Sequence, residues 1–190
     1  MDLSKKITAG LERLSEVFKT LLWEKAKQFG ISPIQIQILL FINSHQTEQA
    51  NVSYLAMEFN VTKPTISDAV RVLLKKGFLE KDFSPTDARR YNLILTDAGR
   101  ELIQELESYS LPVDRQIGQL EPSTQELLFK ALNQTIFRLN QEGVIQVQRT
   151  CFGCRFYQGD RNNSHYCNFL KMDLPNPSLR LDCSDFESVS

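Results

Sequence analysis

The first 150 residues of this 190-residue chain contain no cysteine, and the whole chain has only two histidines. No apolar run approaches the roughly 18 residues that a membrane-spanning helix needs. The N-terminal segment MDLSKKITAG has no apolar signal-peptide core. The sequence also lacks a glycine-rich phosphate-binding loop and a nucleophile elbow. These absences predict a cytoplasmic protein that is not an enzyme and has no membrane partner.

Excess charge of either sign is also missing, since the formal net charge is −1 at pH 7. Such a chain has no overall attraction to nucleic acid, so any basic surface must be local. Residues 62–91 hold seven Lys and Arg against four Asp and Glu, a difference of +3, and the remainder therefore carries −4. The positive charge of the chain is therefore concentrated in residues 62–91.

Residues 61–77, VTKPTISDAVRVLLKKG, predict an amphipathic helix. Thr62 is a good N-cap, Pro64 falls in the first turn, and Gly77 can end the helix in a left-handed conformation. Apolar residues at helical spacing form the buried stripe: Ile66, Ala69, Val70, Leu73 and Leu74. The polar face carries Lys63, Thr65, Ser67, Asp68, Arg71, Lys75 and Lys76. Such hydroxyls and basic groups at a helix N-terminus reach bases and phosphates in a major groove, although an ordinary surface helix has the same pattern.

Three helices are expected before this one. The first covers residues 3–29 and has an apolar stripe so broad that we expect it to lie between two neighbours or between two subunits. The second runs to about residue 44 from a capping box formed by Ser32 and Gln35. Ser53 is expected to cap a short third helix, and residues 60–62 connect it to the fourth. Two short helices joined by a tight turn indicate a helix-turn-helix.

A β-hairpin is predicted after Gly77, with strands at 78–83 and 89–95. Its tip carries Asp87, Arg89 and Arg90. A carboxylate can pair with one arginine while the other remains free to enter a narrow, electronegative minor groove. A solvated hairpin whose charges only keep it soluble explains the same residues.

Two further helical regions complete this part of the chain. Residues 97–110 predict a helix, and residues 111–120 are less regular, with Pro112 as a breaker. A second capping box, Ser123 with Glu126, is expected to open a helix that ends before Gly143.

The order of elements, the residues Asp87-Ala88-Arg89-Arg90 and the following Leu95-Thr96-Asp97-Ala98-Gly99-Arg100 resemble the MarR family of transcriptional regulators. The resemblance covers residues 3–145. It implies a mainly α-helical winged helix-turn-helix with a small β-hairpin wing. It also implies a homodimer that binds double-stranded DNA, with one recognition helix per subunit in consecutive major grooves and a wing in the flanking minor groove.

The same resemblance implies the DNA contacts and the regulation. The predicted contacts are Thr62, Lys63, Pro64, Thr65, Ser67, Asp68, Arg71, Arg89 and Arg90. We expect a sequence-specific regulator, a repressor, that responds to a small-molecule effector as many family members do.

The last segment departs from the family and contains all four cysteines, Cys151, Cys154, Cys167 and Cys183. We predict a separate module at residues 146–190, after a winged domain at residues 1–145. A C-x2-C pair with two further thiolates fits a tetrahedral zinc site that would stabilise this polar tail. A [4Fe–4S] cluster is the alternative, and redox-active thiols without metal are a third.

Two other function classes compete with the regulator. A thiol–disulfide protein would use Cys151 and Cys154, and would place that pair between a strand and a helix. A winged helix can also serve only for protein contacts, an interpretation that the arginines of the hairpin tip disfavour.

Overall fold

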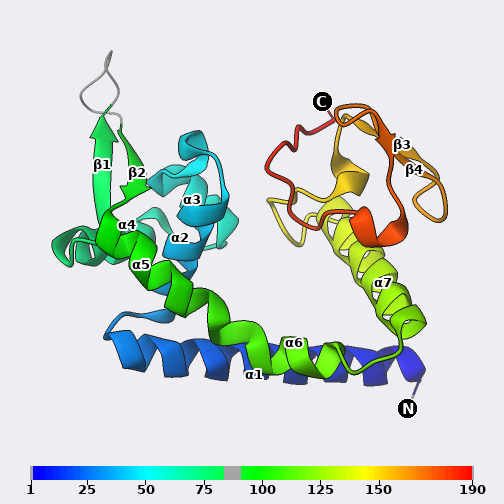
Figure 1. Cartoon of the computed structure of the whole chain (residues 1–190), viewed down its shortest axis with the longest axis horizontal. Helices are drawn as coiled ribbons and strands as arrows, with labels where there is room; N and C mark the ends of the chain where they lie inside the picture. The colour runs from blue at the N-terminus through cyan, green and yellow to red at the C-terminus, as the bar shows by residue number, and fades with distance from the viewer. Residues whose placement is uncertain (1, 84–90, 190) are drawn as a thin grey trace. The chain divides into compact units, whose positions relative to one another are not determined.

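The computed structural model describes residues 2–83 and 91–189, and the chain divides into two compact units (Figure 1). The first unit comprises Met1–Ala56 and Val61–Asp114, and the second comprises Met57–Asn60 and Arg115–Ser190. The sequence placed the boundary after residue 145. In the structure the last long helix therefore lies with the cysteine-containing segment instead of with the winged helix.

The first unit is mainly helical with one two-stranded sheet, as predicted. Its elements are α1 (Leu3–Phe29), α2 (Pro33–Ser44), η1 (Thr47–Gln49), α3 (Val52–Glu58, whose last two residues are assigned to the second unit), α4 (Lys63–Lys75), β1 (Leu79–Phe83), β2 (Tyr91–Leu95), α5 (Asp97–Leu106) and η2 (Glu107–Ser110). The helix-turn-helix of α3 and α4 is present, and Gly77 has the positive φ of 74° that its predicted role requires.

The core of this unit collects the apolar faces of four helices and the wing. Its fully buried side chains are Ile36, Ile38, Leu39, Leu55, Ile66, Leu73, Leu93 and Leu106. They come from α2, α3, α4, β2 and α5, so the wing and the helix-turn-helix share one core. Burial of this apolar area is the main stabilising contribution to the unit.

Helix α1 leaves most of its apolar stripe uncovered within the single chain. Only Leu22 and Ala26 of α1 are buried, whereas Leu3 is 68% and Leu14 is 47% exposed. Other exposed apolar residues of α1 are Ile7, Leu11, Val17, Phe18 and Trp23. Most of the apolar stripe of α1 is therefore not covered by other residues of the same chain.

Two predicted helix caps are wrong, and the predicted capping box of α2 is confirmed. Ser32 and Gln35 form the expected capping box, with the Ser32 N–H donating to Gln35 Oε1 at 2.8 Å. For α3 the cap is Asn51, whose Oδ1 accepts from the Tyr54 N–H at 3.0 Å, because α3 begins at Val52 and Ser53 already lies inside it. Helix α7 (Pro122–Gln141) likewise begins one residue before Ser123, since proline suits the first helical position.

Pro112 does not break the chain into an irregular segment as predicted. It lies in the first turn of α6 (Leu111–Ile117), which follows η2 directly. Proline is tolerated there because the N–H groups of a first turn have no partner within the helix.

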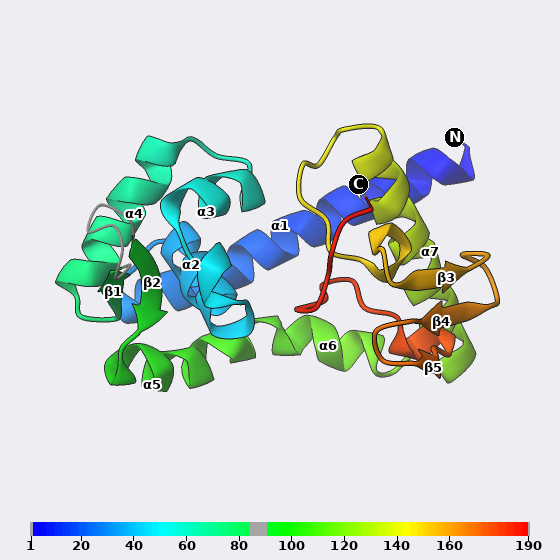
Figure 2. The ribbon, with the colours of Figure 1, turned by 90° about the horizontal axis from the view of Figure 1, so that it is seen from above.

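The wing is tied to α5 by a short motif, and Figure 2 shows strands β1 and β2 side by side. The strands pair antiparallel from Leu79 opposite Leu95 to Phe83 opposite Tyr91. After β2, the Thr96 hydroxyl donates to the Gly77 carbonyl at 2.6 Å and accepts from the Gly99 N–H at 3.1 Å. Thr96 thus caps α5 and holds it against the end of α4.

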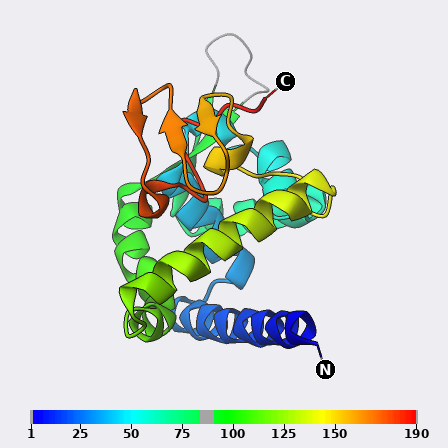
Figure 3. The same cartoon turned by 90° about the vertical axis from the view of Figure 1, so that its right-hand side faces the viewer.

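The second unit consists of α7, a small sheet and short turns (Figure 3). Strands β3 (Tyr157–Gly159), β4 (His165–Cys167) and β5 (Met172–Asp173) form an antiparallel sheet in the order β3-β4-β5. The 3-10 helices η3 (Cys151–Gly153) and η4 (Asn176–Ser178) flank it. Among the described residues, no helix is long and apolar enough to cross a membrane.

Gly99 gives a direct test of the α5 junction. A Cβ at this position would lie 2.2 Å from the Phe78 carbonyl oxygen, a backbone atom that cannot rotate away. We expect Gly99→Ala to lower the free energy of unfolding by about 1–3 kcal/mol, as overpacking does. Chemical denaturation measures this change.

The matched control is Gly10→Ala in α1, where nothing lies within 4 Å of the added Cβ. It should stabilise the protein by up to roughly 1 kcal/mol, because alanine is the better helix former. Equal effects of the two substitutions would contradict the close approach at Gly99.

Candidate nucleic-acid interface and four-cysteine site

Helix α4 presents its N-terminal end to solvent. Lys63, Pro64 and Thr65 are exposed, as are Asp68 and Arg71, and Ser67 is half-buried. The opposite face of α4 is buried through Ile66, Ala69, Val70 and Leu73, as predicted. The candidate DNA-contacting residues of α4 are thus gathered on one accessible face of a helix that the core holds in place.

Thr62 has a structural role at this surface. Its side chain accepts from the Thr65 N–H at 3.4 Å, and the two hydroxyl oxygens are 2.9 Å apart. Thr62 is therefore the N-cap of α4 and also orients the hydroxyl of Thr65. A hydroxyl can donate or accept, so Thr65 can form a further bond to a base edge or a phosphate.

Arg71 and Asp68 form an ion pair across one turn of α4, with Nη2 and Oδ1 2.8 Å apart. Both side chains are largely exposed, so the pair contributes little to stability. Its effect is to position the guanidinium, whose remaining N–H donors stay available for a phosphate or a guanine.

The wing contributes a basic residue at its base. Lys81 Nζ lies 4.2 Å from the centre of the Tyr91 ring, across the two paired strands. The predicted wing contacts Arg89 and Arg90, and Asp87 beside them, lie outside the described residues.

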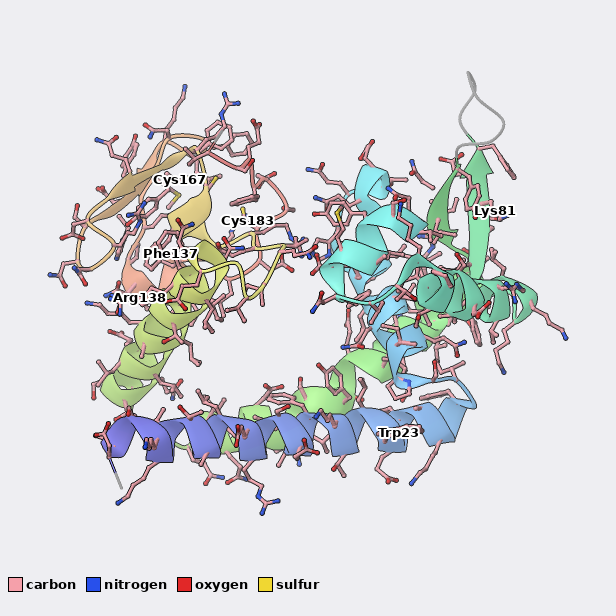
Figure 4. The ribbon with its side chains drawn as sticks, turned by 180° about the vertical axis from the view of Figure 1, so that it is seen from behind. Trp23, Lys81, Phe137, Arg138, Cys167 and Cys183 are labelled. Carbon is pink, nitrogen blue, oxygen red and sulfur yellow. The ribbon has the colours of Figure 1, made fainter. Side chains whose placement is uncertain are left out.

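In the second unit, all four cysteines line one cavity. The other lining residues are Phe156, Tyr157, Tyr166, Phe169, Leu170, Leu174, Ser178, Arg180 and Asp185. Figure 4 shows Cys167 and Cys183 in this unit together with Phe137 of α7. Residues as far apart in the sequence as Cys151 and Cys183 are thus brought together, which the sequence predicted only from their number and spacing.

Hydrogen bonds hold the cysteine-bearing segments against one another. The Cys151 N–H donates to the Arg180 carbonyl and the Cys183 N–H donates to the Arg149 carbonyl, both at 3.1 Å. Arg149 is buried and pairs with Asp182, and also with Glu58 of the short segment 57–60 that belongs to this unit. The turn that carries Cys183 is therefore held by a backbone hydrogen bond to Arg149 and by the ion pair between Arg149 and Asp182.

Three sulfurs accept hydrogen bonds. The Arg180 N–H donates to Cys151 Sγ at 3.2 Å, the Leu170 N–H to Cys167 Sγ at 3.5 Å, and Arg180 Nη1 to Cys183 Sγ at 3.5 Å. Sequence reasoning missed Arg180, although its position three residues before Cys183 was a usable signal. This arginine serves two sulfurs, one through its backbone and one through its side chain.

The protonation of these groups reflects their shared surroundings. Burial raises the pKa of the Cys151 thiol, and the N–H of Arg180 lowers it in part. The nearby Cys183, Cys154 and Cys167 raise it further, because each additional negative sulfur repels the others. The hydrogen bond to Cys183 raises the pKa of Arg180. These surroundings favour the neutral thiol of Cys151.

His165 is buried beside the site without being placed as a ligand. Its Nδ1 lies 2.7 Å from the Tyr157 hydroxyl and its Nε2 lies 2.9 Å from Asn176 Oδ1. Both ring nitrogens of His165 are thus occupied within the module.

The module also has an apolar core that the sequence analysis did not foresee. Cys151, Phe152, Leu174 and Leu179 are buried, with Phe129, Phe137, Tyr157 and Cys167 packed against them. The Phe152 ring contacts Phe137 of α7 edge-on, with centroids 6.0 Å apart. Helix α7 therefore supplies apolar surface that the cysteine-containing segment lacks by itself.

Among the described residues, no group of three or more His, Cys, Asp or Glu side chains is arranged to hold a single metal ion. The zinc ion expected from the sequence stays a prediction. The context for a thiol–disulfide protein is not met, since Cys151 begins a 3-10 turn, Cys154 directly follows it, and the next element is strand β3 instead of a helix.

Comparison with known proteins identifies the fold of the first unit. Residues 29–90 match the model of the MarR family. This chain has the fold of the MarR winged-helix regulators. The complex of Staphylococcus aureus MepR with DNA is 24% identical and superposes with a TM-score of 0.60, over 70% of this chain and 97% of that one.

Two further structures agree. Staphylococcus aureus MarR in complex with salicylate and kanamycin is 19% identical with a TM-score of 0.64, over 74% of this chain and 94% of the other. A MarR transcriptional regulator from Methanosarcina mazei Go1 is 17% identical with a TM-score of 0.60, over 74% and 99%. No curated protein matches the chain.

The apolar core of the module predicts the effect of Phe152→Ala. The variant should destabilise the second unit by about 3–5 kcal/mol, because a buried aromatic side chain is lost and leaves a cavity. Hydrogen exchange should accelerate in residues 122–183 and remain unchanged in α2 and α4. Phe83→Ala, at a residue 55% exposed in the wing, is the control. Unchanged exchange in the second unit would show that it does not depend on this core.

Proposed function

We propose that this chain is a MarR-family transcriptional regulator that binds double-stranded DNA as a homodimer. The observation that carries the proposal is the accessible N-terminal end of α4. Thr65, Ser67 and Arg71 lie on one face of this helix, and its opposite face is buried in the core. The match to the MarR family model and the likeness to MepR in its DNA complex support it.

In this proposal α4 enters the major groove. Thr65 and Ser67 read base edges, and Lys63 and Arg71 contact phosphates or guanine. The hairpin wing enters the flanking minor groove through Arg89 and Arg90. Binding at an operator would exclude other proteins from the same site, so the regulator acts as a repressor.

The dimer forms through the exposed apolar stripe of α1. Large apolar residues at helical spacing along α1, from Leu3 to Phe18, are exposed in the single chain, and a monomer would leave this surface in water. The two-fold axis of the dimer then places the two copies of α4 at two DNA half-sites. The centres of these half-sites lie one helical turn of DNA apart, about 34–36 Å.

A small-molecule effector completes the proposal. A groove in the first unit is lined by α1 and by the segment that leads into α6, through Leu21, Lys25, Tyr109 and Pro112 among others. It combines apolar and charged side chains, as sites for small organic acids do. The salicylate complex of S. aureus MarR supports this part of the proposal.

The first test asks whether DNA affinity depends on a positive charge at α4 or only on the total charge of the protein. Lys63→Ala should weaken binding to all DNA sequences and reduce the slope of log affinity against log salt by about 1, because one phosphate contact is lost. Lys5→Ala removes the same charge from an exposed site on α1 and should leave both quantities unchanged. Equal effects of the two variants, measured by fluorescence anisotropy over a salt series, would argue against α4 as the DNA-binding element.

A second test addresses base reading. Thr65→Ala and Ser67→Ala should change which base is preferred at the contacted positions, by about 1–3 kcal/mol per base pair. Selection from a randomised DNA library, followed by sequencing, measures the preference. Identical preferences in wild type and both variants would remove these hydroxyls from direct reading.

The third test concerns the dimer. Leu14→Glu places a charge in the middle of the exposed stripe of α1 and should shift the protein to a monomer at micromolar concentration in sedimentation experiments. Ala9→Glu adds the same charge on the opposite face of α1 and should remain dimeric. A monomeric wild-type protein, or dimers in both variants, would refute the proposed interface.

A further inference from the structure

We propose that the cavity of the second unit binds a [4Fe–4S] cluster through the thiolates of Cys151, Cys154, Cys167 and Cys183. This site goes beyond the proposed DNA-binding function and does not depend on it. The proposal rests on how the four sulfurs are arranged, what hydrogen bonds they accept and what surrounds them.

The first observation is the convergence of the cysteines on one space. Three separate segments supply them: the η3 turn, the end of β4 and the turn after η4. All four line the same cavity, whose volume is about 30 Å³. A C-x2-C pair and two distant cysteines are therefore assembled around a single small space.

The second observation concerns the size of the group that fits. A zinc ion 2.3 Å from each of four sulfurs would hold the sulfurs about 3.8 Å apart in a tetrahedron. In the part of the chain that is described, no set of such ligands is arranged for one ion. In a cubane cluster each cysteine binds a different iron, so the sulfurs stand further apart around a larger body. Four cysteines around a cavity match the second arrangement.

The third observation is the hydrogen bonding of the sulfurs. Cys151, Cys167 and Cys183 each accept an N–H donor, and two of these donors belong to Arg180. N–H groups aimed at cysteine sulfurs stabilise the negative charge of a thiolate-bound cluster and set its reduction potential. The guanidinium of Arg180 adds a positive charge at the one sulfur in the C-terminal turn.

The fourth observation is the lining between the sulfurs. Phe156, Tyr157, Tyr166 and Phe169 surround the cavity with aromatic carbon, and the Phe156 and Phe169 ring centroids are 5.3 Å apart. An apolar shell restricts water at a metal centre and tunes its potential.

The test uses the full-length chain, purified without oxygen and reconstituted with ferrous iron and sulfide. We expect about four iron and four sulfide per chain, and a brown colour from absorption near the boundary of the visible and ultraviolet. One zinc per chain in a colourless protein would overturn the proposal, and so would a metal-free protein with four titratable thiols.

Variants sharpen this result. Cys183→Ser should lose most of the iron, the sulfide and the colour. Ser178→Ala changes a lining residue that carries no sulfur and should retain the full cluster. Equal iron and sulfide in the two variants would overturn the assignment of Cys183 as a ligand.

Because loss of a ligand can also unfold the module, a variant with all four cysteines is needed. Arg180→Gln should still bind the cluster, and its reduction potential should fall, since a positive charge and an N–H donor to Cys183 are removed. An unchanged potential with full iron content would contradict the contact between Arg180 and a cluster. The DNA affinity of the Lys63→Ala variant is measured independently, so failure of either proposal leaves the other intact.

Discussion

Burial of one face of α4 is the constraint on which the proposed DNA-binding surface depends. Ile66 and Leu73 are fully inaccessible, and α4 packs against α2. Rotating α4 about its axis would expose these side chains and cost about 1.5–3 kcal/mol for each one. The outward direction of Thr65, Ser67 and Arg71 is therefore fixed by apolar residues on the opposite face of α4.

The junction between the wing and α5 extends the same constraint along the chain. Thr96 reaches the Gly77 carbonyl at the end of α4, and Gly99 allows the Phe78 carbonyl to approach α5 closely. Both ends of the hairpin are thus anchored to helices that share the core. The paired strands of the wing are thus held by helices of the same core.

The second unit follows a different principle. Its small apolar core includes Phe137 of α7 and Phe152 of the cysteine-rich segment, so the helix and the tail depend on each other for burial. Cys151 is part of that core and Cys167 packs against it, and the sulfurs of both accept backbone N–H groups. A bound metal group would add to a fold that already has packing of its own, and a change at the metal group would be felt by α7.

Local signals in the sequence determined the winged helix well. Thr62, Gly77 and the pair Ser32 and Gln35 act through neighbours within a few residues, and the structure confirms all of them. Ser53 failed as a cap because Asn51, two residues earlier, competes for the same role, and local propensity cannot decide between them. What only the tertiary structure decided are contacts between distant segments: the packing of Phe137 on Phe152, the two bonds from Arg180 to sulfur, and the gathering of four cysteines around one cavity. These contacts form because side chains from distant segments are buried against one another. The residue pattern within one segment does not show which other segment it will contact.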